Sequence, residues 1–122
     1  MGTRNLVLIS VFATVIICLF FAQTASALSV VATITVGNVP TYVAYDSAKG
    51  EVFVANDGSN SVSVISDTTN SVVATVSYVG SNPFGVTYDS GKGEVFVANS
   101  GSNNVSVIND SNNAKSATFT VN

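Results

Sequence analysis

Apolar and polar residues alternate along residues 28–122 in short segments, and clusters of Gly, Asn, Asp and Ser separate these segments. Alternation with a period of two, in segments rich in β-branched and aromatic residues, indicates β-strands. The pattern predicts no helix in this part of the chain. It predicts strands at Val30–Val36, Thr41–Tyr45, Glu51–Asn56, Ser61–Ile65, Val72–Val79, Phe84–Tyr88, Glu94–Asn99, Asn104–Ile108 and Ala117–Val121.

The chain contains a tandem repeat. Residues 49–56 return letter for letter as residues 92–99, an offset of 43 residues. The positions that define the repeat are Tyr45, Asp46, Gly50, Phe53 and Asn56 in the first copy and Tyr88, Asp89, Gly93, Phe96 and Asn99 in the second. Four short strands per repeat of this length are typical of a β-propeller blade. We therefore expect an all-β fold of two tandem four-stranded antiparallel blades, at 37–79 and 80–122, with one extra N-terminal strand.

The central strand of each repeat is apolar on both faces. Val52 and Val54 point to one side of the predicted sheet, and Phe53 and Ala55 point to the other. A sheet with one face in water would carry polar residues on that face, so this pattern predicts a blade packed between two others. Closed propellers have about 4–8 blades. The expected partners are therefore further blades, of the same longer chain or of other subunits. We expect the extra strand at Val30–Val36 to pair with an exposed sheet edge of its own chain or of a partner.

Residues 1–27 have the features of a secretory signal peptide. Arg4 is followed by an apolar run from Leu6 to Ala22, and Ala25-Ser26-Ala27 is a small-residue cleavage site. We expect cleavage after Ala27 and a location outside the cell or on its surface. The alternative is an uncleaved N-terminal membrane anchor, because the apolar run is at the lower limit for spanning a bilayer.

The composition argues against several function classes. The formal net charge is −3, only 9% of the residues are charged, and the chain has no histidine. The few lysines form no basic stripe, which excludes nucleic-acid binding. The lack of histidine removes the commonest general base and metal ligand, and no nucleophile–base pair is visible. We therefore predict no catalytic, cofactor or metal site and no enzymatic activity.

Several single residues carry more specific predictions. Asp46 and Asp89 follow a strand, where an aspartate more often accepts hydrogen bonds from its own turn than binds a cation. Gly50 is expected to supply a positive φ in that turn. Asn104 and Asn109 each begin an Asn-x-Ser sequence and are predicted glycosylation acceptors in a glycosylating host. Tyr78, at a residue inserted relative to the other repeat, is the tyrosine expected to be exposed.

Taken together, these motifs resemble a known repeat. The sequence Val-Gly-x-x-Pro, then Val-Ala-Tyr-Asp, Gly-Glu-Val-Phe-Val-Ala-Asn and Ser-Val-Ser-Val-Ile, is similar to the YVTN β-propeller repeat of archaeal surface-layer proteins and related secreted bacterial proteins. The four letters of that name appear here as residues 53–56 and 96–99, with conservative changes at two of them. The resemblance covers the whole of residues 28–122 and implies a seven-bladed propeller built from many such repeats.

Two functions remain open from the sequence. The first is an exported, non-catalytic propeller protein that acts at the cell surface as a structural element or binds surface proteins or glycans. The alternative is a fragment of a propeller enzyme, lactonase-like or quinoprotein-like, whose active residues lie on other blades.

Overall fold

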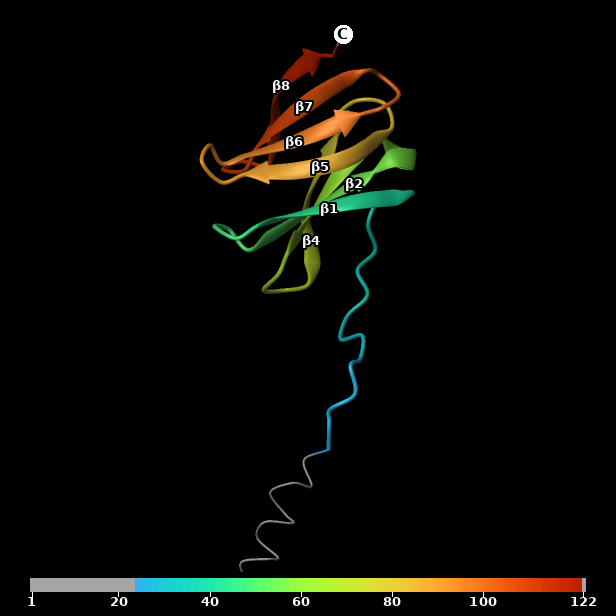
Figure 1. Ribbon diagram of the computed structural model, residues 1–122, viewed down its shortest axis with the longest axis vertical. Helices are drawn as coiled ribbons and strands as arrows, with labels where there is room; N and C mark the ends of the chain where they lie inside the picture. Colours follow the sequence, from blue (N-terminus) through green and yellow to red (C-terminus); the bar gives the residue numbers. More distant parts are fainter. Residues whose placement is uncertain (1–23, 122) are drawn as a thin grey trace, which may run out of the picture. The chain divides into compact units, whose positions relative to one another are not determined.

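The computed structural model describes residues 24–121, and their regular structure is almost entirely β. The first sheet contains β1 (Pro40–Asp46), β2 (Glu51–Asn56), β3 (Ser61–Ser66) and β4 (Ser71–Ser77), and the second contains β5 (Pro83–Asp89), β6 (Glu94–Asn99), β7 (Asn104–Asn109) and β8 (Ala114–Thr120). All neighbours are antiparallel and follow chain order (Figure 1). The two predicted four-stranded blades are thus confirmed. A single 3-10 turn, η1 (Asp57–Ser59), joins β2 to β3.

The extra N-terminal strand predicted at Val30–Val36 is not formed. These residues have no regular secondary structure, and each sheet contains four strands with no fifth. The segment has the alternation of a strand, but alternation alone does not create a strand, because the backbone groups also need a neighbouring edge to bond with. The prediction of pairing with an edge of a partner stays a prediction.

The predicted signal peptide, residues 1–27, lies mostly outside the described residues, which begin at Thr24. Cleavage after Ala27 and the membrane-anchor alternative therefore both stay predictions. Among residues 24–121, no helix has the length and apolar character needed to cross a bilayer.

The second sheet repeats the first even in its irregularities. The ladder between β1 and β2 shifts register between Pro40 and Val43, and the ladder between β5 and β6 shifts between Pro83 and Gly85. The third and fourth strands of each blade also shift register at equivalent positions. The central pairs, β2 with β3 and β6 with β7, run without interruption. The sequence repeat is therefore a repeat of backbone geometry as well.

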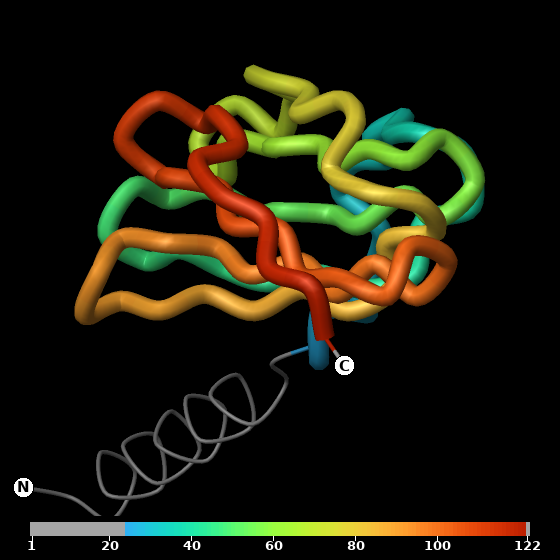
Figure 2. Tube along the Cα trace, turned by 90° about the horizontal axis from the view of Figure 1, so that it is seen from above, coloured from blue at the N-terminus to red at the C-terminus, as the bar shows by residue number. Residues whose placement is uncertain are grey.

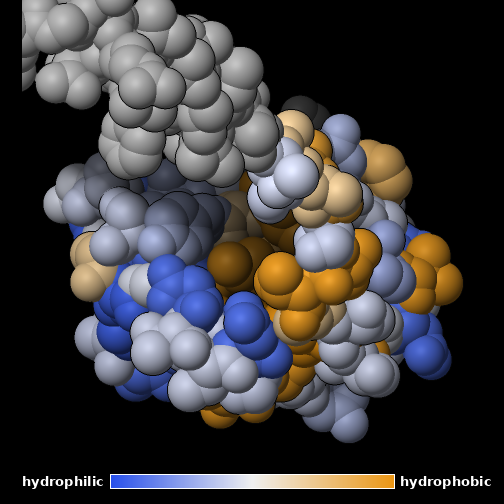
Figure 3. Space-filling view, turned by 90° about the horizontal axis from the view of Figure 1, so that it is seen from below, coloured by the Kyte–Doolittle hydropathy of each residue, from blue (hydrophilic) through white to orange (hydrophobic). Residues whose placement is uncertain are grey.

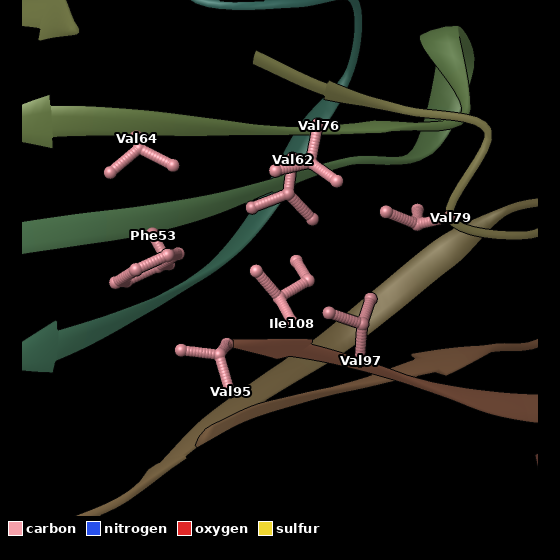
Figure 4. Packing of buried hydrophobic residues seen from close by; sticks show 8 residues of the cluster. All are labelled: Phe53, Val62, Val64, Val76, Val79, Val95, Val97 and Ile108. Carbon is pink, nitrogen blue, oxygen red and sulfur yellow. The ribbon is translucent and has the colours of Figure 1, made fainter. Parts of the chain in front are cut away.

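The core lies between the two sheets. It is formed by Phe53, Val62, Val64 and Val76 of the first blade, Val79 of the connection, and Val95, Val97 and Ile108 of the second blade (Figure 4). β5 packs against both β1 and β2, so the first strands of the two blades lie in close contact. The Cα trace in Figure 2 shows the same strands from above, with the second blade coloured from yellow to red and the first blade in green.

Candidate functional site

Each blade presents two different apolar faces, and the contact between the blades uses one of each. We call the side that carries Phe53 and Ala55, or Phe96 and Ala98, the forward face of its blade. The opposite side, with the two valines of the same strand, is the rear face. In the structure the forward face of the first blade packs on the rear face of the second. Phe53, Ala55, Val95 and Val97 are fully buried there.

Cross-strand neighbours complete both faces. Phe53 lies opposite Val64, and Ala55 lies opposite Val62, so β3 extends the forward face of the first blade. Val95 lies opposite both Tyr88 and Ile108, so β5 and β7 extend the rear face of the second blade. Burial of a side chain of this size stabilises a fold by about 1.5–3 kcal/mol. The apolar contact between the blades is therefore the main interaction that holds the two sheets together.

Polar contacts surround this apolar contact. The Lys49 ammonium donates a hydrogen bond to the backbone oxygen of Asp110 in the other blade. The Asn113 amide donates to both carboxylate oxygens of Glu51 at 3.3 Å. Lys49 and Glu51 also form an ion pair of 3.8 Å within the first blade. The loop after β7 is thus held by two side chains at the start of β2.

A second polar contact joins the blades near the loop between β2 and β3. The side-chain oxygen of Asn60 accepts a hydrogen bond of 2.9 Å from the backbone nitrogen of Asn82. Thr41 donates a further bond of 2.9 Å to the backbone oxygen of Phe84. These bonds fix the register of one blade on the other, which apolar contact alone does not do.

Asp46 and Asp89 lie in the turns that follow β1 and β5. Oδ1 of Asp46 accepts hydrogen bonds from the backbone nitrogens of Ala48 at 2.8 Å and Lys49 at 3.2 Å. Oδ1 of Asp89 accepts one from Gly91 at 2.9 Å. Among residues 24–121, neither aspartate belongs to a group of three or more potential metal-ligating side chains.

The same turns contain the repeated glycines. Gly50 and Gly93 both have a φ of +66°, which confirms the positive φ expected of Gly50. Their backbone oxygens accept hydrogen bonds of 2.9 and 3.0 Å from Asp67 and Asp110 respectively. A side chain at either position would be strained, because L-residues rarely adopt this backbone conformation.

Tyr45 and Tyr88 tie the first strand of each blade to the turn after the third. The Tyr45 hydroxyl donates a hydrogen bond of 2.8 Å to Asp67, and the Tyr88 hydroxyl donates one of 3.0 Å to Asp110. The bond to Asp67 raises the pKa of Tyr45. Burial raises the pKa of Tyr88, and the nearby carboxylates of Asp110 and Asp46 raise it further. The Tyr88 ring thus contributes to the blade contact, whereas 53% of Tyr45 is exposed.

Asn56 and Asn99, at the ends of the central strands, are buried. The Asn99 amide donates hydrogen bonds to Asn104 at 2.8 Å, to Ser106 at 3.1 Å and to the backbone oxygen of Val79 at 3.3 Å. Asn56 donates to two serines of β3 in the same way. Asn99 thus lies under the connection between the blades, and Asn56 lies under the segment that leads into β1.

The predicted glycosylation acceptors lie on β7. The side-chain oxygen of Asn104 accepts the bond from Asn99, and that of Asn109 accepts a bond of 2.9 Å from the backbone nitrogen of Ser111. Both side chains are half-buried. Modification of either asparagine stays a prediction.

The two faces that the blade contact does not use remain partly exposed. On the rear face of the first blade, Val43 is 64% exposed and Tyr45 is 53% exposed, and on the forward face of the second blade Phe119 is 59% exposed. Two hollows, of about 490 and 400 Å³, are lined in part by Gly85, Ala98 and Val105 of the second blade. Figure 3 shows apolar side chains gathered beside a strongly polar area on one side of the molecule.

Stacked four-stranded antiparallel sheets that repeat every 43 residues define a class of protein, the β-propellers. Within that class, the chain belongs to the family described as "Lactonase, 7-bladed beta-propeller", whose model matches residues 12–122. The expectation that the protein is not an enzyme is therefore wrong. It depended on the lack of histidine in these blades, and a catalytic centre that several blades share cannot be judged from two of them.

Solved structures have the same fold. Hydrazine synthase from Kuenenia stuttgartiensis matches with a TM-score of 0.63 and 26% sequence identity over 68% of this chain and 24% of that chain. Apo AztD from Citrobacter koseri matches with a TM-score of 0.62 and 11% identity over 72% of this chain and 25% of that chain. The chain thus spans about a quarter of each of these structures. No curated protein matches it.

Proposed function

We propose that this chain supplies two neighbouring blades of an exported, lactonase-type β-propeller. The observation that carries this proposal is the pair of unused blade faces. The forward face of the second blade repeats the residues that the first blade buries, and the rear face of the first blade repeats those that the second blade buries. An apolar sheet face of this kind requires a covering layer.

The chemistry follows from the family. A lactonase adds water to the carbonyl carbon of a cyclic ester, the ring carbon–oxygen bond breaks, and a hydroxy acid results. In our proposal the residues that activate the water belong to other blades of the propeller. The two blades described above provide the rigid wall that holds those residues in place. Their first strands, β1 and β5, lie in close contact, and in our proposal they form the inner side of this wall.

Export is the second part of the proposal. Support comes from the small-residue site at residues 25–27 after an apolar run, and from the resemblance of the repeats to those of secreted proteins. A surface poor in charged residues and rich in Ser, Thr and Asn is consistent with it.

The test uses the native protein that contains this sequence, recovered from its source cells with an antibody against the chain. Acid release at constant pH is measured with a panel of γ- and δ-lactones, and the mass and cellular fraction of the particle are recorded. We expect lactone-dependent acid release from an exported particle with a complete set of blades. Failure to open any lactone of the panel would refute the enzymatic part, and recovery only from the cytosol would refute export.

A further inference from the structure

We infer that Lys49 and Asn113 join the two blades by a covalent amide bond, and that Glu51 promotes its formation. The bond links Nζ of Lys49 to Cγ of Asn113, and one molecule of ammonia is released. The inference comes from three side chains that meet at the edge of the blade contact. It does not depend on lactone chemistry or on what covers the unused faces.

The Glu51 carboxylate contacts both of the groups that the bond joins. Nζ of Lys49 lies 3.8 Å from Oε2 of Glu51, and Nδ2 of Asn113 lies 3.3 Å from each carboxylate oxygen. Lys49 and Glu51 belong to the first blade, whereas Asn113 belongs to the second and follows Glu51 by 62 residues. Folding thus brings together an amine, a carboxyl group and a carboxamide, which can act as nucleophile, general acid–base and electrophile.

The loop that carries the carboxamide is held in place by several bonds. The Lys49 ammonium donates a hydrogen bond to the backbone oxygen of Asp110 in this loop. The Asp110 backbone nitrogen donates a bond of 3.0 Å to Gly93, and its carboxylate accepts one of 3.0 Å from the Tyr88 hydroxyl. Well-oriented groups of one molecule react at effective concentrations of about 10⁵–10⁸ M. A reaction that is negligible between free side chains therefore becomes accessible here.

The amide of Asn113 is incompletely satisfied in its present orientation. Its Oδ1 atom is buried and has no hydrogen-bond partner among residues 24–121. Transfer of a proton from the Lys49 ammonium to Glu51 removes both charges of the ion pair and turns the carboxyl group into a donor. Half a turn of the amide then brings Oδ1 to this donor. The resulting hydrogen bond satisfies the buried oxygen and polarises the carbonyl group of the amide.

The covalent step balances without a further reactant. The neutral Lys49 amine attacks Cγ of Asn113 and forms a tetrahedral intermediate, whose oxygen the Glu51 carboxyl group stabilises. A proton of the attacking nitrogen passes through this carboxyl group to the leaving nitrogen. The bond between Cγ and Nδ2 then breaks, the carbonyl group re-forms, and ammonia leaves. Ammonia takes up the proton held by Glu51, so the products are an amide, an ammonium ion and the original carboxylate.

The chain also contains an unlinked copy of the same three residues. They recur at the repeat offset of 43 as Lys92, Glu94 and Asn70. The blade contact takes the lysine and the glutamate from the earlier blade and the asparagine from the later one, so Asn70 is on the wrong blade to meet Lys92 and Glu94. Among residues 24–121, Lys92 and Glu94 form no ion pair, in contrast to their counterparts. We therefore expect one link within this chain.

Peptide mapping of the folded full chain by mass spectrometry tests the bond. We expect a branched peptide that joins the segment around Lys49 to the segment around Asn113 and has the mass of both segments less one molecule of ammonia. Glu51→Gln and Asn113→Ala should abolish this peptide. Glu94→Gln and Asn70→Ala change the corresponding residues of the unlinked copy and are the matched controls, which should retain it. Circular dichroism checks that each variant folds.

The wild-type protein alone can overturn the inference. Folded wild-type chain that yields only unbranched peptides, with Lys49 and Asn113 intact, would show that the link does not form. Loss of ammonia without a branched peptide would also overturn it, because that result indicates a cyclic imide at an asparagine. A wild-type yield of branched peptide from Glu51→Gln would refute the role of the carboxyl group. None of these results depends on lactone opening, so the proposed function and this inference can fail separately.

Discussion

Asn99 and Gly80 show how single residues set the connection between the blades. A Cβ at Gly80 would lie 2.3 Å from the side-chain carbon of Asn99, and a Cβ at Gly37 would lie 2.7 Å from that of Asn56. Glycine is therefore required at both positions by close approach, since the buried amide occupies the space of a side chain. This explains why the glycine and the asparagine recur together in the two repeats.

Replacing Gly80 by alanine should destabilise the fold by about 1–3 kcal/mol, the usual cost of overpacking a well-packed site. Urea unfolding measures the change. Gly85→Ala is the control, because a Cβ there would meet only Ala98, at an ordinary contact distance of 3.8 Å. Equal effects of the two substitutions would show that Asn99 does not require the glycine.

Val39 carries backbone strain. It is β-branched, yet its φ is +52°, whereas the equivalent residue of the second repeat is the asparagine Asn82. The left-handed conformation costs most L-residues about 1–2 kcal/mol, and asparagine tolerates it better because its short polar side chain can form local hydrogen bonds. Val39→Asn should therefore raise the free energy of unfolding by about 1 kcal/mol. Val73→Asn, at an exposed position of β4, should give no such gain, and a destabilised Val39→Asn protein would contradict the argument.

At the scale of the element, the sequence predicts strands well wherever the repeat is identical. β2 and β6 begin and end at the predicted residues, Glu51–Asn56 and Glu94–Asn99. Tyr78 is 85% exposed, as its position at an inserted residue indicated, and its φ of 57° ends the strand predicted to run to Val79. The strand bounds and the exposure of Tyr78 depend on neighbouring residues in the sequence, so the pattern of those residues predicts them.

The features that the sequence did not predict correctly depend on residues far apart in the chain. Val30–Val36 has the pattern of a strand but no neighbouring edge, and pattern cannot tell whether an edge exists. The contacts of Lys49 with Asp110 and of Asn113 with Glu51 join residues about 60 positions apart in the sequence. No spacing in one repeat indicates them, although their recurrence at the repeat offset is visible once one contact is known.

Tyr88, which joins β5 to the turn after β7, should make the free energy of unfolding fall at alkaline pH. The pKa of Tyr88 is raised in the folded protein by burial and by the carboxylates near its hydroxyl. Above the ordinary tyrosine pKa of about 10, the unfolded chain loses this proton before the folded chain does. The folded state then binds more protons, so the free energy of unfolding falls as pH rises.

We therefore expect wild-type protein to lose more stability than Tyr88→Phe between about pH 9 and pH 11. Denaturant unfolding across this range measures both proteins, and the same measurement at neutral pH gives the cost of the lost hydrogen bond. Parallel pH curves for the two proteins would show that Tyr88 does not titrate differently on folding.

For the whole molecule, the central fact is that the chain contains one blade contact and two unused halves of another. The sequence repeat predicted stacked blades. The structure confirms two blades that share a core. The sequence could not predict which face of a blade meets the next, because both faces are apolar. Membership in the lactonase family then relates these blades to a family of propellers that their own residues do not indicate.

The most direct test of this account is the molar mass of the folded wild-type chain, measured by light scattering from low to high micromolar concentration. If the unused faces are the two halves of a blade contact, they should associate when no further blade covers them, and the mass should rise above that of one chain as the concentration increases. A folded protein that keeps the mass of a single chain throughout this range would contradict the account, because its apolar faces would then be stable in water.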